Sequence, residues 1–411
     1  MQTGYKIAGI DVHKKMLAVV VCDSQAEVLE FERRRFGSTV SELRHLLAWL
    51  QERGVQTVVM ESTAQYWKPV WLELEGKFVL HLAHAWSNRA RMGRKTDFRD
   101  AIRLVQRLLS GDLILSYVPE AGQRMWRTLT RHRQQLIRDR VRLHSQLESL
   151  LQEMQIKLSS VISDLLGVSG RRMLRALSQG QTDPGQLAAL ADPRLEARPE
   201  QLRDALNGRS QPSHCKLLAL FLDRLALLEA QLGELEQLIA EELKGQAEAV
   251  VRIAELPGLG VNSAHQILAE VGPQAAVFAS AAALASWVGV CPGRQESAGN
   301  SRSNHSPKGN PPMRRLLNQA AHAAVKEDGS YLQAVFRHWL PTLGYNKAIW
   351  AIAHKICRLI WKVLHDGIHY LERGQLTNPR SLKRKRQKLV AQLRKMGYQV
   401  QLTPLLQQAQ G

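Results

Sequence analysis

The sequence predicts an α/β domain followed by a longer all-helical region. Within the first 118 residues, short apolar runs of strand length alternate with amphipathic stretches of helical period. After Pro119 the apolar residues recur three and four positions apart, which is the spacing of packed or coiled helices. We expect four parts: an α/β domain over 1–118, a helical coiled-coil region over 119–250, a second helical domain over 251–370 and a basic tail over 371–411.

The chain is strongly basic. Its 56 Lys and Arg residues outnumber 37 Asp and Glu residues, which gives a net charge of +19. Such an excess favours a polyanionic partner, most simply nucleic acid. A membrane surface is the alternative, but no signal peptide precedes the first apolar run, and the longest uncharged run, Ala275–Cys291, is too short to cross a bilayer. We expect that run to be a packed helix.

The four cysteines lie far apart and none has C-x-x-C spacing. This pattern argues against a zinc site or a disulfide framework. We therefore expect a protein of the reducing cytoplasm with no membrane partner.

The first domain should open with three strands and continue with alternating helices and strands. We expect strands over Ile7–Asp11, Met16–Cys22, Val28–Arg33, Val55–Met60 and Phe78–Ala83, and helices over Val40–Glu52, Tyr66–Leu74 and Asp97–Leu109. This order of elements is typical of the ribonuclease-H-like fold.

Four carboxylates fall at informative places in these elements. Alternation along the first strand places Asp11 on one face with Ile7 and Gly9, where a bare carboxylate is costly without a cation, a partner or water. The other three follow a strand or open a helix: Glu61 closes the strand of residues 55–60, and Asp97 and Asp100 lie one turn apart.

Together these carboxylates can hold two divalent ions, Mg²⁺ by preference, roughly 3.5–4 Å apart, as in phosphoryl transfer. None of the four has an obvious Lys or Arg partner in its own element. Alternatively, Asp11 caps a turn, and Asp97 and Asp100 form a solvated first helical turn.

The middle region contains two heptad-like stretches. Over Leu129–Met154 the seam is interrupted by arginines at its start, and we expect Arg131, Arg138 and Arg142 to lie along phosphates. From Leu218 to Ile239 the seam is cleanly apolar. This spacing fits an antiparallel hairpin within one chain or a dimer interface equally well.

The third domain opens with a Pro-Gly-x-Gly turn between two helical patterns. Such a turn is similar to a helix-hairpin-helix element, in which backbone N–H groups near Gly258 and Gly260 would hold a DNA phosphate, although a plain helix–helix turn remains the alternative. Residues 293–310 form a small-polar stretch that is either a linker or a loop presenting a hydroxyl, with Arg294, Arg302 and Lys308 available for phosphate.

Helices are expected over Met313–Val325 and around the apolar stripe from Ile349 to Val363, whose opposite side is basic. Beyond them lies a basic cluster suited to sequence-independent phosphate binding: Lys383, Arg384, Lys385 and Arg386.

Three segments of the first domain resemble a known family. Residues 9–14 (Gly-Ile-Asp-Val-His-Lys), 60–63 (Met-Glu-Ser-Thr) and 95–101 (Lys-Thr-Asp-Phe-Arg-Asp-Ala) are similar to the RuvC-like DEDD domain of transposases of the insertion-sequence one-ten family, including its eleven-eleven subgroup. Carried over by position, the family's four acidic residues fall on Asp11, Glu61, Asp97 and Asp100.

The Ser-Ala-Gly of residues 297–299, followed by Lys-Gly-Asn and a Leu- and Ala-rich helix, resembles the second half of the same signature. There a serine before a small residue is the nucleophile, which falls on Ser297. The family usually has Ser-Gly at this point, so Ser301 is a second candidate.

The resemblance implies a DNA transposase or recombinase that forms a covalent phosphoserine link to DNA. It also implies a homo-oligomer, dimer or tetramer through the coiled coil, in which the metal-bearing domain of one subunit acts with the serine domain of another, and a structured guide RNA from the element. Two rivals remain: a RuvC-like junction resolvase in which water attacks, and a non-catalytic nucleic-acid scaffold.

Overall fold

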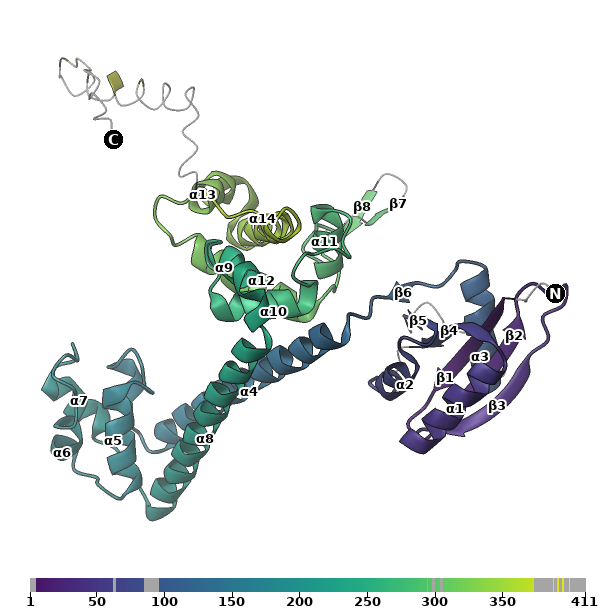
Figure 1. The fold of residues 1–411 in the computed structure, drawn as a ribbon. Helices are drawn as coiled ribbons and strands as arrows, with labels where there is room; N and C mark the ends of the chain where they lie inside the picture. Colours follow the sequence, from purple (N-terminus) through teal and green to yellow (C-terminus); the bar gives the residue numbers. More distant parts are fainter. Residues whose placement is uncertain are drawn as a thin grey trace. The chain divides into compact units, whose positions relative to one another are not determined.

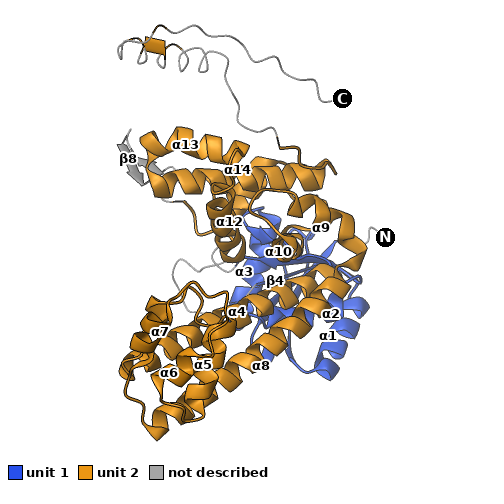
Figure 2. Cartoon of the chain, turned by 90° about the vertical axis from the view of Figure 1, so that its left-hand side faces the viewer, with its two compact units in different colours: residues 1–120 blue, residues 121–411 orange. Residues whose placement is uncertain are grey.

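The structure, a computed structural model, forms two compact units, residues 1–120 and residues 121–411 (Figures 1 and 2). It describes residues 5–61, 64–84, 96–293 and 306–372, the backbone of 295–297 and 300–303, and isolated positions beyond 386. Each unit is described by itself below.

The first unit is built on a mixed six-stranded sheet. Its strands are β1 (Lys6–Val12), β2 (Met16–Asp23), β3 (Glu32–Gly37), β4 (Val55–Glu61), β5 (Val79–Ala83) and β6 (Leu115–Ser116), in the order β3-β2-β1-β4-β5-β6. β1, β2 and β3 form an antiparallel meander, β4 and β5 run parallel to β1, and β6 pairs antiparallel with β5. This is the predicted ribonuclease-H-like fold with one short extra strand.

Helices cover both faces of this sheet (Figure 1). On one face, α1 (Val40–Glu52) and α2 (Trp67–Leu74) pack against Ala8, Ile10 and Val12 of β1. On the other, α3 (Asp97–Leu109) packs against a second core that includes Ile7. The strand therefore presents alternate residues to two cores, as the sequence predicted for β1.

The third strand was predicted in the wrong place. The expected strand Val28–Arg33 is largely a loop, and Val28 is 73% exposed. β3 begins at Glu32 instead, because pairing of Phe36 with Leu17 puts the Phe36 ring in the core against Trp49. Charged residues cover most of this edge strand, so its sequence carries little apolar signal.

Gly9 allows α3 to approach β1 very closely. A Cβ atom at Gly9 would lie 2.4 Å from the carbonyl oxygen of Ala101 and 2.7 Å from a methyl group of Val105. Ala101 directly follows Asp100, and Asp11 is the next residue along β1 on the same face as Gly9. The close contact therefore brings the first turn of α3 to the end of β1.

Gly9→Ala should push α3 away from the sheet. We expect it to lower the free energy of unfolding by about 1–3 kcal/mol, as overpacking of a core does, and to reduce any activity of the acidic cluster. Denaturant titration of the full chain measures the loss. Gly233→Ala is the matched control, because no atom lies within 4 Å of a Cβ built there, and it should stabilise by roughly 0.5–1 kcal/mol. Equal effects of the two substitutions would contradict the packing argument.

The second unit begins with a long helical hairpin. α4 (Ala121–Glu153) and α8 (Pro212–Glu242) run antiparallel, since Arg133 pairs with Glu236 near one end and Leu143 packs on Leu225 and Leu228 further along (Figure 1). At the far end of the hairpin lie a 3-10 turn (Leu158–Ser160), α5 (Val168–Ser178), α6 (Pro184–Ala188) and α7 (Pro199–Leu206). The apolar seam of α8 is thus filled within the chain.

The remaining helices form one core around α14 (Tyr345–His365), whose Ile349, Ile352 and Ile356 are buried. The other elements are a 3-10 turn (Lys244–Gln246), α9 (Ala247–Ala254), α10 (Val261–Val271), α11 (Ala281–Val288), β7 (Gln295–Ser297), β8 (Asn300–Ser303), α12 (Pro311–Ala324) and α13 (Tyr331–Leu343). Only α11 is helical within the uncharged run that was expected to be one helix, because Ser280 caps it with a hydrogen bond to the Ala283 N–H. Among the described residues, no helix combines the length and apolarity that a membrane span requires.

Candidate active site

The acidic residues of the first unit gather at one edge of the sheet. β1 and β4 run parallel with Ile10 opposite Met60, so Asp11 and Glu61, the next residue on each strand, lie side by side. Asp97 and Asp100 occupy the first turn of α3, which packs on β1 at Gly9. Asp11 and Asp100 are both buried, with 8% and 6% of their surface exposed.

Asp11, Asp97 and His13 form one group that could hold a metal ion. One possible ligand atom from each lies within 4.8 Å of the other two. The Nε2 atom of His13 is 3.1 Å from Asp11 Oδ2 and 3.4 Å from Asp97 Oδ1, and Arg35 lies 3.8 Å from Asp97 Oδ2. His13 was not predicted as a site residue, although it lies two positions after Asp11, the spacing that keeps side chains on one face of a strand.

Asp100 and Glu61 are the other two carboxylates at this edge. Asp100 accepts a hydrogen bond from Arg103 at 2.7 Å, one turn further along α3. The expectation that no carboxylate of the set has a cation in its own element is therefore wrong for Asp100, because Arg103 lies at i+3 on the same face of the helix. Glu61 ends β4, and its charge acts on Asp11 together with the charges of Asp97 and Asp100.

Burial raises the pKa of the Asp11 carboxyl above its ordinary value. The neighbouring His13 opposes this rise, whereas Asp100, Glu61 and Asp97 each add to it by repulsion. Crowded carboxylate oxygens are the donor set that hard divalent cations prefer, and a bound cation would relieve both the burial cost and the repulsion. The cluster thus fits a metal site.

The serine segment forms a small antiparallel hairpin where a loop was expected. Ser297 at the end of β7 pairs with Asn300, and Ser301 of β8 pairs with Glu296. The structure gives only the backbone of these two strands, and Arg294 lies outside the described residues. Arg302 is placed on β8, while Lys308 follows the hairpin and is exposed.

The base of this hairpin is held closed by glycine packing. Gly309 has φ +52°, and a Cβ there would lie 2.0 Å from the Val288 carbonyl oxygen. The next residue, Asn310, donates its N–H to that same oxygen at 3.1 Å. Arg314 donates to the carbonyl oxygens of Gly289 and Pro307, so both stems of the segment are tied to α12.

The Glu270 side chain holds the same stem through a hydrogen bond to Asn310. Its side chain is fully buried, and it accepts hydrogen bonds at 2.7 and 2.9 Å from Arg131 and at 3.0 Å from the side-chain amide of Asn310. Asn310 also caps α12 by accepting the Met313 N–H. The guanidinium of Arg131, predicted to lie along phosphates, is therefore engaged within the protein, and this contact raises its pKa.

Removal of the Glu270 charge should be destabilising. In Glu270→Gln, Arg131, whose side chain is 50% exposed, loses a charge-assisted pair with a fully buried carboxylate, so we expect the free energy of unfolding to fall by about 1.5–3 kcal/mol. Glu241→Gln breaks an exposed pair with Lys244 and should cost less than about 1 kcal/mol. Chemical denaturation compares the two. Similar losses would show that Glu270 does not hold the hairpin stem in place.

The other residues predicted to bind nucleic acid are scattered over the second unit. Arg138 and Arg142 are exposed on α4, and Arg142 lies 3.6 Å from Asp139. Gly258 has φ +77°, and a Cβ atom there would lie 2.2 Å from the Ala320 carbonyl oxygen, so close packing on α12 accounts for the glycine. Gly260 is the N-cap of α10. The basic residues Lys383, Arg384, Lys385 and Arg386 lie outside the described part of the chain.

Comparison with known proteins finds transposases. A family model described as a transposase with a DEDD domain matches residues 8–156, and a model of the transposase IS116/IS110/IS902 family matches residues 251–337. Together they cover more than half of the chain.

Three curated relatives match part of the chain. An uncharacterized 43.6 kDa protein of insertion element IS110 from Streptomyces coelicolor is 27% identical over 29% of this chain and 30% of that protein. An uncharacterized 42 kDa protein of insertion element IS900 from Mycobacterium paratuberculosis is 27% identical over 35% of this chain and 36% of that protein. The putative transposase y4pF/y4sB from Sinorhizobium fredii is 26% identical over 30% of this chain and 33% of that protein. The chain thus aligns with about a third of the length of each relative.

The ribonuclease-H-like sheet carries an acidic edge whose oxygen donors suit a metal ion. The serine hairpin lies in the region that the second family model matches. The chain belongs to the IS116/IS110/IS902 family of transposases.

Proposed function

We propose that this protein is a DNA transposase that cuts and rejoins strands by attack of the Ser297 hydroxyl on phosphodiesters, assisted by two Mg²⁺ ions at the acidic cluster. The observation that carries the proposal is the gathering of Asp11, Asp97, Asp100 and Glu61 at one edge of the sheet. Family membership supports it, since both matched models describe transposases.

In this proposal the carboxylates bind the metal ions. Asp11 and Asp97 have oxygen atoms within 4.8 Å of each other, with Glu61 and Asp100 nearby, and His13 orients the two aspartates through its Nε2 atom. Divalent cations bound there would neutralise charge on the scissile phosphate and make a hydroxyl oxygen more nucleophilic. Arg103 fixes Asp100 from the side of α3.

The serine provides the covalent step. A new bond forms between Ser297 Oγ and phosphorus, the bond from phosphorus to one strand oxygen breaks, and the serine proton ends on the strand hydroxyl that leaves. A hydroxyl of another strand then attacks the phosphoserine, which rejoins DNA and returns the proton to Ser297. One phosphodiester replaces another at each step, so no external energy source is needed.

The charge of the chain supports a nucleic-acid partner. The net charge of +19 favours a polyanion, and the family resemblance implies that this is DNA together with an element-encoded guide RNA. The basic residues 383–386 would bind phosphates without sequence preference. On the second unit, burial lowers the pKa of Arg315, and the charge of Arg138 lowers it further. We further propose that the active protein is a homo-oligomer.

A strand-transfer assay tests the proposal. The full chain, with any RNA that copurifies, would be incubated with DNA carrying its own gene and flanking sequence, in Mg²⁺ or in EDTA. We expect Mg²⁺-dependent exchange of strands and a protein–DNA adduct that survives denaturation. Cleavage without an adduct would favour a junction resolvase that uses water, and the absence of any cleavage would favour a non-catalytic scaffold.

A further inference from the structure

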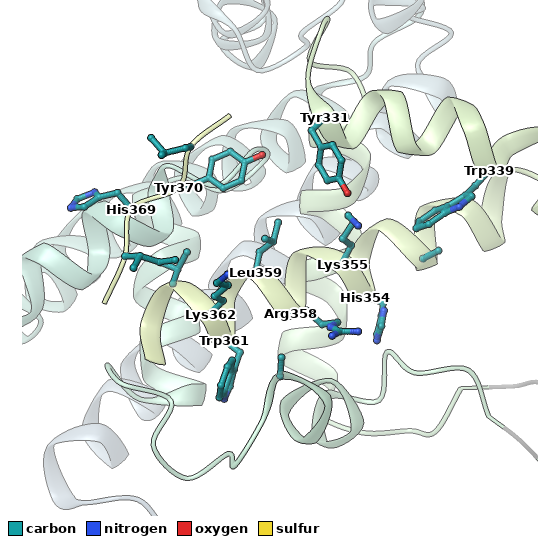
Figure 3. Close-up of a pocket in the computed structure, with 15 residues that line it drawn as sticks. Tyr331, Trp339, His354, Lys355, Arg358, Leu359, Trp361, Lys362, His369 and Tyr370 are labelled. Atoms are coloured by element: carbon teal, nitrogen blue, oxygen red, sulfur yellow. The ribbon is translucent and has the colours of Figure 1, made fainter. Parts of the chain in front are cut away.

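A cavity of about 880 Å³ lies beside α14 (Figure 3). Helix α14 forms one wall, Tyr331 and Trp339 of α13 form a second, and residues 368–371 close a third. The size is within the range of pockets that hold small ligands or single nucleotides.

Three cations line this cavity along one helix. Lys355, Arg358 and Lys362 lie on α14 at i, i+3 and i+7, so they project to the same side. Within the described part of the chain, no carboxylate lies within ion-pair distance of any of the three. Arg358 and Lys362 are exposed, so their charges are available to a ligand.

Aromatic rings accompany these cations. The Lys355 ammonium lies 5.0 Å from the centroid of the Tyr331 ring and 6.0 Å from that of Trp339. In Figure 3 the Tyr370 ring extends toward Tyr331. The hydroxyl of Tyr370 donates to Glu372 at 2.9 Å, and this contact fixes the direction of the ring.

Two nearby carboxylates hydrogen-bond to residues that line the cavity. Glu372 accepts hydrogen bonds from the Tyr370 hydroxyl and the Tyr331 N–H, and Glu255 accepts from His369 and the Tyr370 N–H. They hold the third wall in place, and the α14 side of the cavity remains cationic.

We propose that this cavity binds an unpaired nucleotide of single-stranded nucleic acid. Aromatic faces stack on bases whatever the sequence, and the row of cations on α14 follows the phosphates on either side. Duplex DNA or RNA offers its bases already stacked, so only an unpaired base can enter. An acidic peptide would use the cations but leave the rings without a stacking partner.

This proposal adds a binding site to the proposed function. It rests on the proposed function in one respect, because both require that the protein binds nucleic acid. Binding is measured without cleavage, so a failure here leaves the metal and serine chemistry untouched. Loss of strand transfer, conversely, would not affect the binding result.

Fluorescence anisotropy with short labelled oligouridine, oligothymidine and a DNA duplex tests the site in the full chain. We expect Arg358→Gln/Lys362→Gln to weaken single-strand binding by about tenfold and to reduce the salt slope by up to about 1.4 units, or about 0.7 for each phosphate contact. Lys216→Gln/Arg224→Gln, a matched pair of exposed cations on α8 outside the cavity, should change neither quantity. Equal effects of the two double variants would overturn the proposal.

Photocrosslinking of the unaltered protein gives a direct readout. Oligouridine with 4-thiouridine and oligothymidine with 4-thiothymidine should crosslink to peptides containing Tyr331, Trp339 or Tyr370. The stronger probe identifies RNA or DNA as the source of the nucleotide. Crosslinks that fall only on other peptides, or tighter binding of the duplex than of both single strands, would refute the assignment.

Discussion

Asp11→Asn is expected to reduce metal-dependent strand cleavage by roughly a thousandfold or more while the first unit stays folded. The Asn side chain keeps the shape of Asp11 but cannot supply the anionic oxygen that a divalent cation needs. Strand cleavage in Mg²⁺, measured on the same DNA for both proteins, gives the ratio. Asp112→Asn, an exposed aspartate beyond α3, is the control and should retain activity.

The same variant should not be less stable when metal is absent. Because burial raises the pKa of Asp11, the folded chain binds this proton more tightly than the unfolded chain does. In EDTA, the free energy of unfolding therefore falls as the pH rises through that pKa, and Asn removes this loss. Added Mg²⁺ should raise the melting temperature of the unaltered protein but not that of Asp11→Asn. A large loss of stability in EDTA would attribute the inactivity to misfolding.

Ser297→Ala is expected to abolish both recombination and the covalent adduct. The hydroxyl is the only atom group that the substitution removes, and the backbone pairing of Ser297 with Asn300 needs no side chain. Metal binding at the acidic cluster should therefore persist, and a melting-temperature rise with Mg²⁺ would show that it does.

Ser301→Ala and Ser303→Ala are control variants at two serines of the facing strand, β8. Ser301 pairs with Glu296, and Ser303 with Gln295, so each lies at a different register position from Ser297. Both variants should retain adduct formation to within about tenfold. Loss of the adduct in Ser301→Ala alone would show that Ser301, and not Ser297, is the nucleophile.

Elements with a strong apolar period could be predicted from the sequence. The helices Val40–Glu52 and Asp97–Leu109 were predicted to the residue, because their buried leucines and valines follow helical spacing. β3 was misplaced because its pairing depends on a single ring, Phe36, on an otherwise charged edge strand. The hairpin β7–β8 has almost no apolar residues, so its pairing left no signal in a small-polar segment.

Some residues of the candidate site could likewise be predicted from the sequence, and others could not. Asp11, Glu61 and the α3 aspartates could be found because each ends a strand or opens a helix. The partners His13 and Arg103 lie two and three residues from Asp11 and Asp100, so local spacing does indicate them. The burial of Glu270 depends on three helices packing together, and such long-range contacts are not encoded in local spacing.

The position of the covalent bond tests the central claim most directly. The unaltered protein would be incubated with DNA and Mg²⁺, denatured, digested with nuclease and protease, and its peptides sequenced by mass spectrometry. The proposed function predicts a nucleotide phosphate attached to Ser297, formed in Mg²⁺ and absent in EDTA. A phosphate on any other residue, or cleaved DNA ends with no attached peptide, would contradict it.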